Sequence, residues 1–190
     1  MNDYHCLQKQ RYAIGDYILT PIRKGDIQFI KDWRNEQIDV LRQKKQLTEH
    51  DQINYYENII KKTFGEKEPS QILFSFLLKG KCIGYGGLVH IDWKTKSAEV
   101  SFLTETLRSR DTKLYSNDFT IFLEIILQLT FNQIKFKQLV SETYDIRPKT
   151  IEILKNFGFK QKSRLKEHVL INGTYIDSLI YVYLKSDFKE

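Results

Sequence analysis

Hydrophobic and polar positions along the chain switch repeatedly between the two-residue period of strands and the wider period of amphipathic helices. Near the start, the run Asp16–Ile22 predicts a strand that Pro21 ends. Residues 23–37 carry apolar side chains at the spacing of one helix face, which predicts a first helix. A second helix is predicted from Thr48, because Asp51 three places on forms a loose variant of the capping box. The chain is therefore expected to begin with one strand and two helices.

The centre of the sequence reads as consecutive strands. Three apolar runs follow one another across short polar turns, at residues 71–80, 81–92 and 97–105. Short links of this kind favour antiparallel hairpins. The middle run contains three glycines, which indicate a bulge or a close approach of another group to the backbone. They are Gly84, Gly86 and Gly87, and we expect them to serve sheet curvature rather than ligand contact.

The next segments are expected to be a helix and a strand. Residues 116–132 have a helical pattern, and Ser116 or Asn117 is available as the N-cap. Residues 136–144 have the apolar and β-branched composition of a strand. A helix between two strands implies at least one crossover connection beside a largely antiparallel sheet.

The last third of the chain predicts a short helix and a hairpin. Pro148 suits the first turn of that helix, where its missing N–H costs nothing, and Gly158 suits the position just past its end. Two alternating runs then flank Asn172-Gly173, a strong short-range hairpin signal. This order predicts an α+β fold in a single domain, residues 1–190. Its mixed, mostly antiparallel, twisted sheet should have about seven strands flanked by about four helices.

Composition and charge narrow the class of protein. The formal net charge of +6 favours an anionic partner. No basic face interleaved with aromatic residues occurs, so a nucleic-acid partner is not expected. The most apolar stretch, Phe119–Leu129, is too short to cross a bilayer, so association with a membrane is not expected either. Cys6 and Cys82 form no cluster with the four histidines, and the N-terminus lacks the apolar core of a secretory signal. These features predict a cytoplasmic protein without a metal site.

Several stretches, taken in order, resemble the GNAT superfamily of acyl-CoA N-acyltransferases. They are "DWRNEQ" (32–37), "KCIGYGGLVHID" (81–92), "SAEVSF" (97–102), "TIEILKNFGF" (150–159) and "LKEHVLINGTYIDSLIYVYL" (165–184). The chain is most similar to the branch that includes ribosomal-protein and amino-sugar N-acetyltransferases. The resemblance covers roughly Tyr17–Leu184, and its specificity lies in the order and spacing of the stretches.

The resemblance implies an acetyl-CoA-dependent N-acetyltransferase. In this chemistry a primary amine attacks the thioester directly, so the expected acceptor is a small-molecule or peptide amine, either an amino sugar or a protein α-amine. In the family, two parallel strands splay apart and the pantetheine arm of the coenzyme pairs with the backbone of one of them. That strand would be Val100–Thr104, with Phe102, Leu103 and Thr104 as coenzyme contacts, and Gln138–Glu142 would be its neighbour.

One stretch departs from the family pattern. The family holds the diphosphate of the coenzyme on a glycine-rich turn at the start of the next helix, but the corresponding Leu114–Phe119 contains no glycine. In one interpretation, polar and cationic side chains replace the backbone contacts. Those side chains are Arg108, Arg110, Lys113, Ser116 and Asn117. In the other, coenzyme binding has been lost, residues 108–113 are a solvated loop, and the chain is a non-catalytic binding or regulatory domain.

Two catalytic residues are expected. Glu99 lies on the strand that enters the cleft, where a carboxylate can take a proton from an ammonium group through water; an ordinary charged position on a strand face is the alternative. Many relatives have a tyrosine general acid where this chain has Leu154. Tyr144 is a substitute at the end of the splayed strand, unless it is only a packed aromatic residue.

The substrate side has three candidates. Arg34 and Asn35 resemble the substrate-side loop of the relatives, and Arg34 has the chemistry to hold a phosphate or carboxylate of the acceptor. His90 is the third candidate, because histidine is the side chain that most often exchanges a proton near neutral pH. The alternatives are an exposed helix-end salt bridge for Arg34 and a surface position for His90. Exposed aromatic residues in the last hairpin leave both a monomer and a homodimer open.

Overall fold

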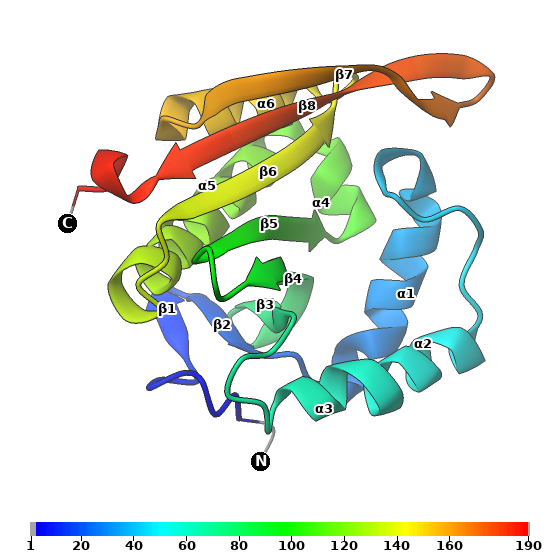
Figure 1. Ribbon diagram of the computed structural model, residues 1–190. Helices are drawn as coiled ribbons and strands as arrows, with labels where there is room; N and C mark the ends of the chain where they lie inside the picture. Colours follow the sequence, from blue (N-terminus) through cyan, green and yellow to red (C-terminus); the bar gives the residue numbers. More distant parts are fainter. Residues whose placement is uncertain (1–2, 190) are drawn as a thin grey trace.

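The computed structural model describes residues 3–189 and shows one eight-stranded sheet with helices packed against it (Figure 1). The strands lie in the order β1-β2-β3-β4-β5-β6-β8-β7. Their bounds are β1 Tyr12–Ile14, β2 Tyr17–Pro21, β3 Ile72–Leu78, β4 Lys81–Asp92, β5 Ser97–Thr104, β6 Gln138–Tyr144, β7 Lys160–Ile171 and β8 Thr174–Leu184. All neighbours are antiparallel except β5 and β6. The predicted α+β class with a mostly antiparallel sheet is confirmed.

The helices form two groups. Their bounds are α1 Ile27–Glu36, α2 Glu49–Tyr55, α3 Lys61–Thr63, α4 Thr106–Arg110, α5 Thr112–Gln128 and α6 Pro148–Phe157. A π-helical turn, Tyr56–Ile60, joins α2 to α3, and another, Leu129–Gln133, extends α5. In Figure 1, α5 and α6 lie behind the upper strands, whereas α1, α2 and α3 are grouped at the right and below. Across residues 3–189, no helix combines the length and the apolar character that crossing a membrane requires.

The end signals predicted from the sequence are present. The Thr48 hydroxyl accepts a hydrogen bond from the amide of Asp51 (3.1 Å), and the Asp51 carboxylate accepts one from the amide of Thr48 (2.9 Å). Pro148 is the first residue of α6, and Gly158 ends that helix with φ of 99°. Asn172-Gly173 forms the turn between β7 and β8 with both φ angles positive. The predicted helix ends and hairpin turn are therefore consistent with the overall fold.

Two features differ from the prediction. The short strand β1 was not expected; it pairs with β2 across a turn in which Gly15 has φ of 55°. The long helix begins at Thr112, so the proposed N-caps, Ser116 and Asn117, were wrong. Asp111 caps α5 instead, because its side chain accepts hydrogen bonds from backbone amides of the first turn.

The glycines of β4 are required by the close approach of neighbouring elements. A Cβ on Gly86 would lie 2.2 Å from the carbonyl oxygen of Ser101 in β5 and 2.8 Å from the Phe122 ring of α5. A Cβ on Gly87, whose φ is 151°, would lie 2.0 Å from the carbonyl oxygen of Ile72 in β3. The expectation of a close approach was correct, and protein backbone and the Phe122 ring provide it.

We expect Gly86→Ala to lower the free energy of unfolding by about 2 to 3 kcal/mol, because the added methyl group must displace the backbone of β5 and the ring of Phe122. Urea denaturation of both proteins measures this. Gly25→Ala is the matched control, since a Cβ there meets nothing within 4 Å, and its effect should stay within about 0.5 kcal/mol. Equal stabilities for the two variants would contradict the packing argument.

Candidate active site

The centre of the sheet opens between its two parallel strands. Residues Ser97–Glu99 of β5 pair with Gln138–Val140 of β6, and beyond these three residue pairs the strands separate (Figure 1). A cavity of about 350 Å³ lies along the separation and is lined by side chains from both strands, from α5 and from the start of α6. A second cavity of about 340 Å³, lined mainly by α1, α2 and the neighbouring strands, lies beside it and shares Arg34 and Tyr55. We call these two adjoining cavities, at the place where β5 and β6 part, the recess.

Two carboxylates face each other across the separation. The Arg42 guanidinium donates through one nitrogen, Nη2, to Glu99 of β5 (2.7 Å) and to Glu142 of β6 (2.6 Å). Both glutamates are largely buried, with side chains 19% and 14% exposed. His90 Nε2 lies 3.2 Å from Nη1 of Arg42. Sequence reasoning found Glu99 and His90 but missed Arg42 and Glu142, because only the fold brings residues from the two strands and a loop together.

Glu142 has one oxygen that is not satisfied. Its Oε2 accepts from Arg42, whereas its Oε1 is buried without a hydrogen-bond partner within the described part of the chain. The Nδ1 atom of His168 lies 3.5 Å from Oε1 and contacts the Ser178 hydroxyl at 2.8 Å. A buried carboxylate oxygen without a donor is costly. The arrangement therefore suits a ligand that brings a hydrogen-bond donor.

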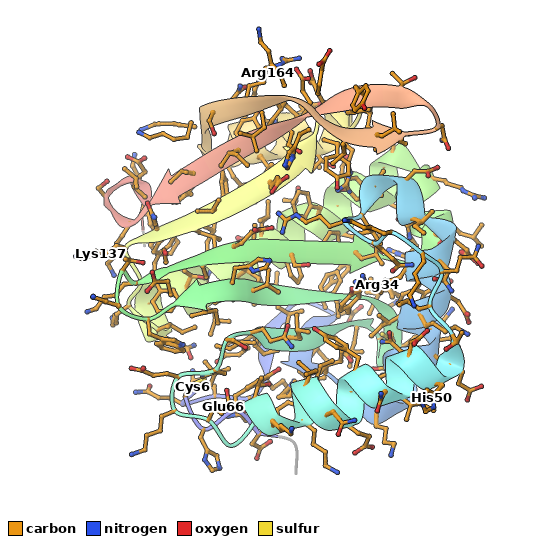
Figure 2. All side chains as sticks on the ribbon, turned by 45° about the vertical axis from the view of Figure 1, so that its right-hand side comes forward. Cys6, Arg34, His50, Glu66, Lys137 and Arg164 are labelled. Atoms are coloured by element: carbon orange, nitrogen blue, oxygen red, sulfur yellow. The ribbon has the colours of Figure 1, made fainter. Side chains whose placement is uncertain are left out.

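Of the two substrate-side residues predicted in α1, Arg34 lines the cavities and Asn35 does not. Arg34 lines both cavities, donates to the Tyr85 hydroxyl and to Gln43 (3.0 Å), and extends from α1 toward the strands (Figure 2). Asn35 is bonded to the backbone of Leu47 through both its oxygen and its nitrogen (2.8 Å each). Asn35 thus fixes the loop that carries Arg42 and does not line either cavity.

Of the three coenzyme contacts predicted on β5, only Phe102 lines the cavity. The ring of Phe102 lines it and stacks on Phe119 of α5 at a centroid distance of 5.0 Å. Leu103 and Thr104 are buried away from it, and the Thr104 hydroxyl donates to the carbonyl of Ile83 (2.7 Å). Tyr144, the proposed proton donor, lies at the end of β6, is buried and lines the cavity.

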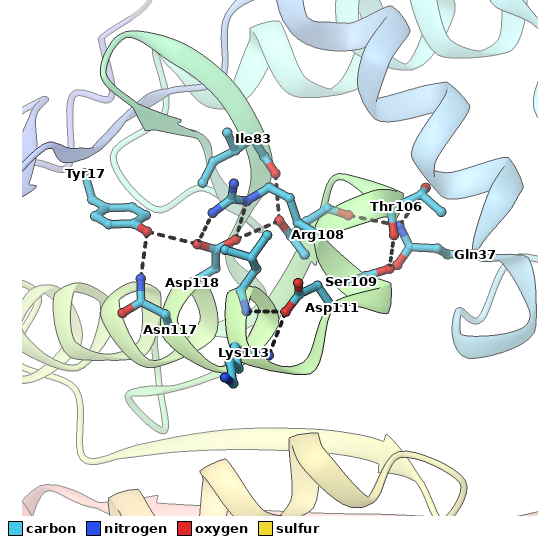
Figure 3. A network of polar contacts seen from close by, with 12 residues as sticks. Tyr17, Gln37, Ile83, Thr106, Arg108, Ser109, Asp111, Lys113, Asn117 and Asp118 are labelled. Atoms are coloured by element: carbon cyan, nitrogen blue, oxygen red, sulfur yellow. Dashed lines mark hydrogen bonds and ion pairs between the residues drawn. The ribbon is translucent and has the colours of Figure 1, made fainter.

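Arg108 is engaged in a buried ion pair (Figure 3). Its Nε and Nη2 donate to the two oxygens of Asp118 at 2.6 and 2.7 Å, and Asp118 is fully buried in α5. This hydrogen-bonded partner raises the pKa of Arg108. Asp118 also accepts from the hydroxyl of Tyr17 (3.1 Å), to which Asn117 donates (2.7 Å). Arg108 and Asn117 therefore hold α4, α5 and β2 together and do not extend toward a ligand.

The start of α5 already carries an anion. Asp111 Oδ1 accepts from the backbone amides of Lys113 (2.9 Å) and Leu114 (3.0 Å). The Ser116 hydroxyl donates within the helix, to the carbonyl of Thr112 (2.7 Å). Because a carboxylate occupies these amides, the diphosphate of a coenzyme does not fit on them as it does on a glycine-rich turn. Of the predicted phosphate contacts, Arg110 and Lys113 remain exposed.

The cysteines are unsuited to nucleophilic catalysis. Burial raises the pKa of the Cys82 thiol to about 12 and that of Cys6 to about 11, so very little thiolate exists at neutral pH. Within residues 3–189, no three His, Cys, Asp or Glu side chains are grouped so that they could hold a metal ion. The titratable chemistry at the recess is that of carboxylates, imidazoles and tyrosines.

Comparison with known proteins identifies the family. The model of the acetyltransferase (GNAT) domain matches residues 19–180. A spermidine N-acetyltransferase from Vibrio cholerae, solved with CoA and spermine, superimposes with a TM-score of 0.79 at 18% identity, covering 90% of this chain and 97% of the other. A GCN5-related N-acetyltransferase from Brucella melitensis gives 0.69 at 18% identity, with coverages of 96% and 82%. No curated protein matches the sequence.

The chain belongs to the GNAT acetyltransferase family, because that model spans most of its length. It is therefore an N-acetyltransferase with acetyl-CoA as its co-substrate. The solved structures, at these identities, establish the shared fold. The family resemblance inferred from the sequence is confirmed.

We expect Asp118→Ala to lower the free energy of unfolding by about 3 kcal/mol, because it leaves the Arg108 guanidinium without its buried partner. Glu152→Ala is the matched control: it breaks the exposed Lys149–Glu152 pair, and its effect should stay below about 1 kcal/mol. Urea denaturation at fixed salt compares the two. A loss at Asp118 as small as the control's would show that the ion pair does not support the site.

Proposed function

We propose that this protein acetylates a primary amine whose nitrogen binds between Glu99 and Glu142 and attacks the acetyl thioester directly. The observation that carries the proposal is the buried, unpartnered Oε1 of Glu142 beside a second carboxylate where β5 and β6 separate. A substrate ammonium group supplies the missing hydrogen-bond donor. The same oxygen can then accept the ammonium proton, which frees the amine lone pair for attack.

The roles of the chain's own groups follow from their positions. Glu142 is the proposed base, and Glu99 adds negative charge that favours binding of the cationic acceptor. Arg42 holds the two carboxylates together across the separated strands. Burial, and to a smaller extent the nearby Glu142 carboxylate, raises the pKa of Tyr144. Tyr144 therefore keeps its proton at neutral pH and is the proposed donor to the departing thiolate.

The acyl donor is proposed to bind on the helix side of the recess. Phe102 lines the cavity there, and Arg110 and Lys113 are the exposed cations near the start of α5. Because Asp111 occupies the first amides of α5, we assign the diphosphate to these two side chains, a role that the ion pair with Asp118 denies to Arg108.

The proposed acceptor is a class of primary amines. Arg34 and His90 line the same cavity as the two carboxylates and suit an acceptor that carries an anionic group besides its amine, as a nucleotide-linked amino sugar does. A protein α-amine is the other candidate. The solved relatives include spermidine acetyltransferases, which supports an amine acceptor of some kind.

The glycine-free, carboxylate-capped start of α5 makes donor binding the first step to test. The non-catalytic domain considered from the sequence is set aside by the family match. Calorimetry of the wild-type protein with acetyl-CoA should show saturable binding. Absence of binding at high protein concentration would contradict the proposed donor site.

We expect Arg110→Gln/Lys113→Gln to weaken acetyl-CoA binding about tenfold, because two charge-assisted contacts to phosphate are lost. The matched control is Lys62→Gln/Lys67→Gln, which removes the same charge at exposed positions in α3 and the turn after it and should bind acetyl-CoA as the wild type does. Calorimetry at constant salt measures all three proteins. Equal weakening in both variants would indicate a general charge effect and remove the assignment of the diphosphate site.

We expect Glu142→Gln to lower kcat about a hundredfold or more with a panel of primary amines, because the amide cannot accept the ammonium proton. Glu99→Gln should mainly raise KM, since it removes attraction for the cation. Glu152→Gln, on the exposed face of α6, is the control and should leave both constants unchanged. Release of free thiol from acetyl-CoA follows the reaction. Wild-type kcat in Glu142→Gln would exclude Glu142 as the base.

A further inference from the structure

Tyr115 closes the helix side of the recess. It belongs to α5, is 7% exposed and lines the cavity, with its ring tilted against those of Phe119 (5.9 Å between centroids) and Phe102 (6.3 Å). Its hydroxyl lies 2.8 Å from the hydroxyl of Thr150 and accepts from Nη2 of Arg147 (3.1 Å). Thr150 is in the first turn of α6 and Arg147 is its N-cap. One side chain thus bridges α5 and α6.

The position of this bridge conflicts with an occupied donor site. The proposed base, Glu142, lines the cavity on the strand side, whereas the exposed Arg110 and Lys113 lie near the start of α5. A donor that reaches from these cations to Glu142 between α5 and α6 meets the Tyr115 side chain, because the Tyr115 hydroxyl is bonded to Thr150 and Arg147 at the start of α6. That path is obstructed while these two hydrogen bonds remain.

We propose that Tyr115 controls the access of the acyl donor, and that its hydrogen bonds to Thr150 and Arg147 hold the passage closed until the ring rotates away. This inference rests on the proposed function. The site is then an equilibrium between a closed form and a binding-competent open form. The apparent affinity for the donor is reduced by the fraction that is open. Each hydrogen bond of the hydroxyl shifts such an equilibrium by a few-fold to about tenfold.

The contacts separate the two parts of the Tyr115 side chain. Tyr115→Phe removes the hydroxyl but keeps the ring packed against Phe102 and Phe119. Thr150→Val removes the partner hydroxyl in α6 and leaves Tyr115 intact. Tyr115→Ala removes the ring and opens the passage completely, at the cost of a void beside the aromatic cluster. Tyr175→Phe is the matched control, since Tyr175 is 62% exposed in the terminal hairpin.

Stopped-flow association of acetyl-CoA with each protein tests the proposal. Tyr115→Phe and Thr150→Val should associate about fivefold faster than the wild type, with dissociation unchanged, and Tyr175→Phe should match the wild type. Thermal melting checks that each variant is folded, and the first two variants keep the test valid if Tyr115→Ala does not fold.

The outcomes separate this proposal from the proposed function. If the wild type binds acetyl-CoA and both conservative variants associate at the wild-type rate, Tyr115 does not control access and the proposed function stands. If only folded Tyr115→Ala binds, the access role of Tyr115 is supported, whereas the proposed function fails because the wild type does not bind its donor. If no folded variant binds acetyl-CoA, both the access role and the proposed function are overturned.

Discussion

The short parallel pairing between β5 and β6 is the constraint on which the rest of the structure depends. Each strand is fully engaged on its other side, β5 with β4 and β6 with β8, so neither can shift to close the gap after Glu99 and Val140. The remaining residues of β5 and β6 therefore face each other without backbone pairing between the two strands. Carboxylates occupy the strand side of this space, and aromatic rings from α5 occupy the helix side.

Two arginines have opposite uses around the gap because their surroundings differ. Arg108 meets a fully buried aspartate in a two-point contact and ties α4 to α5 on the donor side. Arg42 comes from a loop, is 45% exposed and shares one nitrogen between two glutamates. The first arrangement satisfies both carboxylate oxygens and is structural. The second leaves one oxygen of Glu142 without a donor, which makes that end of the recess suitable for an amine.

Local sequence patterns predicted local structure well. The capping box at Thr48, the Pro148 start and Gly158 end of α6, and the Asn172-Gly173 turn each depend on neighbouring residues only, and all were found. The start of α5 was misplaced because Ser116 or Asn117 was expected as its cap, whereas the cap is Asp111. Aspartate and serine cap helices about equally well, so the local pattern does not distinguish them. Strand β1 was missed because its three residues are too few to show a period.

The sequence by itself determined the fold class, the family and one of the two facing carboxylates, because caps, turns and periodic apolar positions act over a few residues. Only the tertiary structure decided which charged groups meet. Arg42 and Glu142 are 100 residues apart. Arg108, predicted as a ligand of the diphosphate, is instead a structural contact through Asp118 on another helix. Such pairings depend on how strands and helices pack in three dimensions, and no spacing along the chain contains that information.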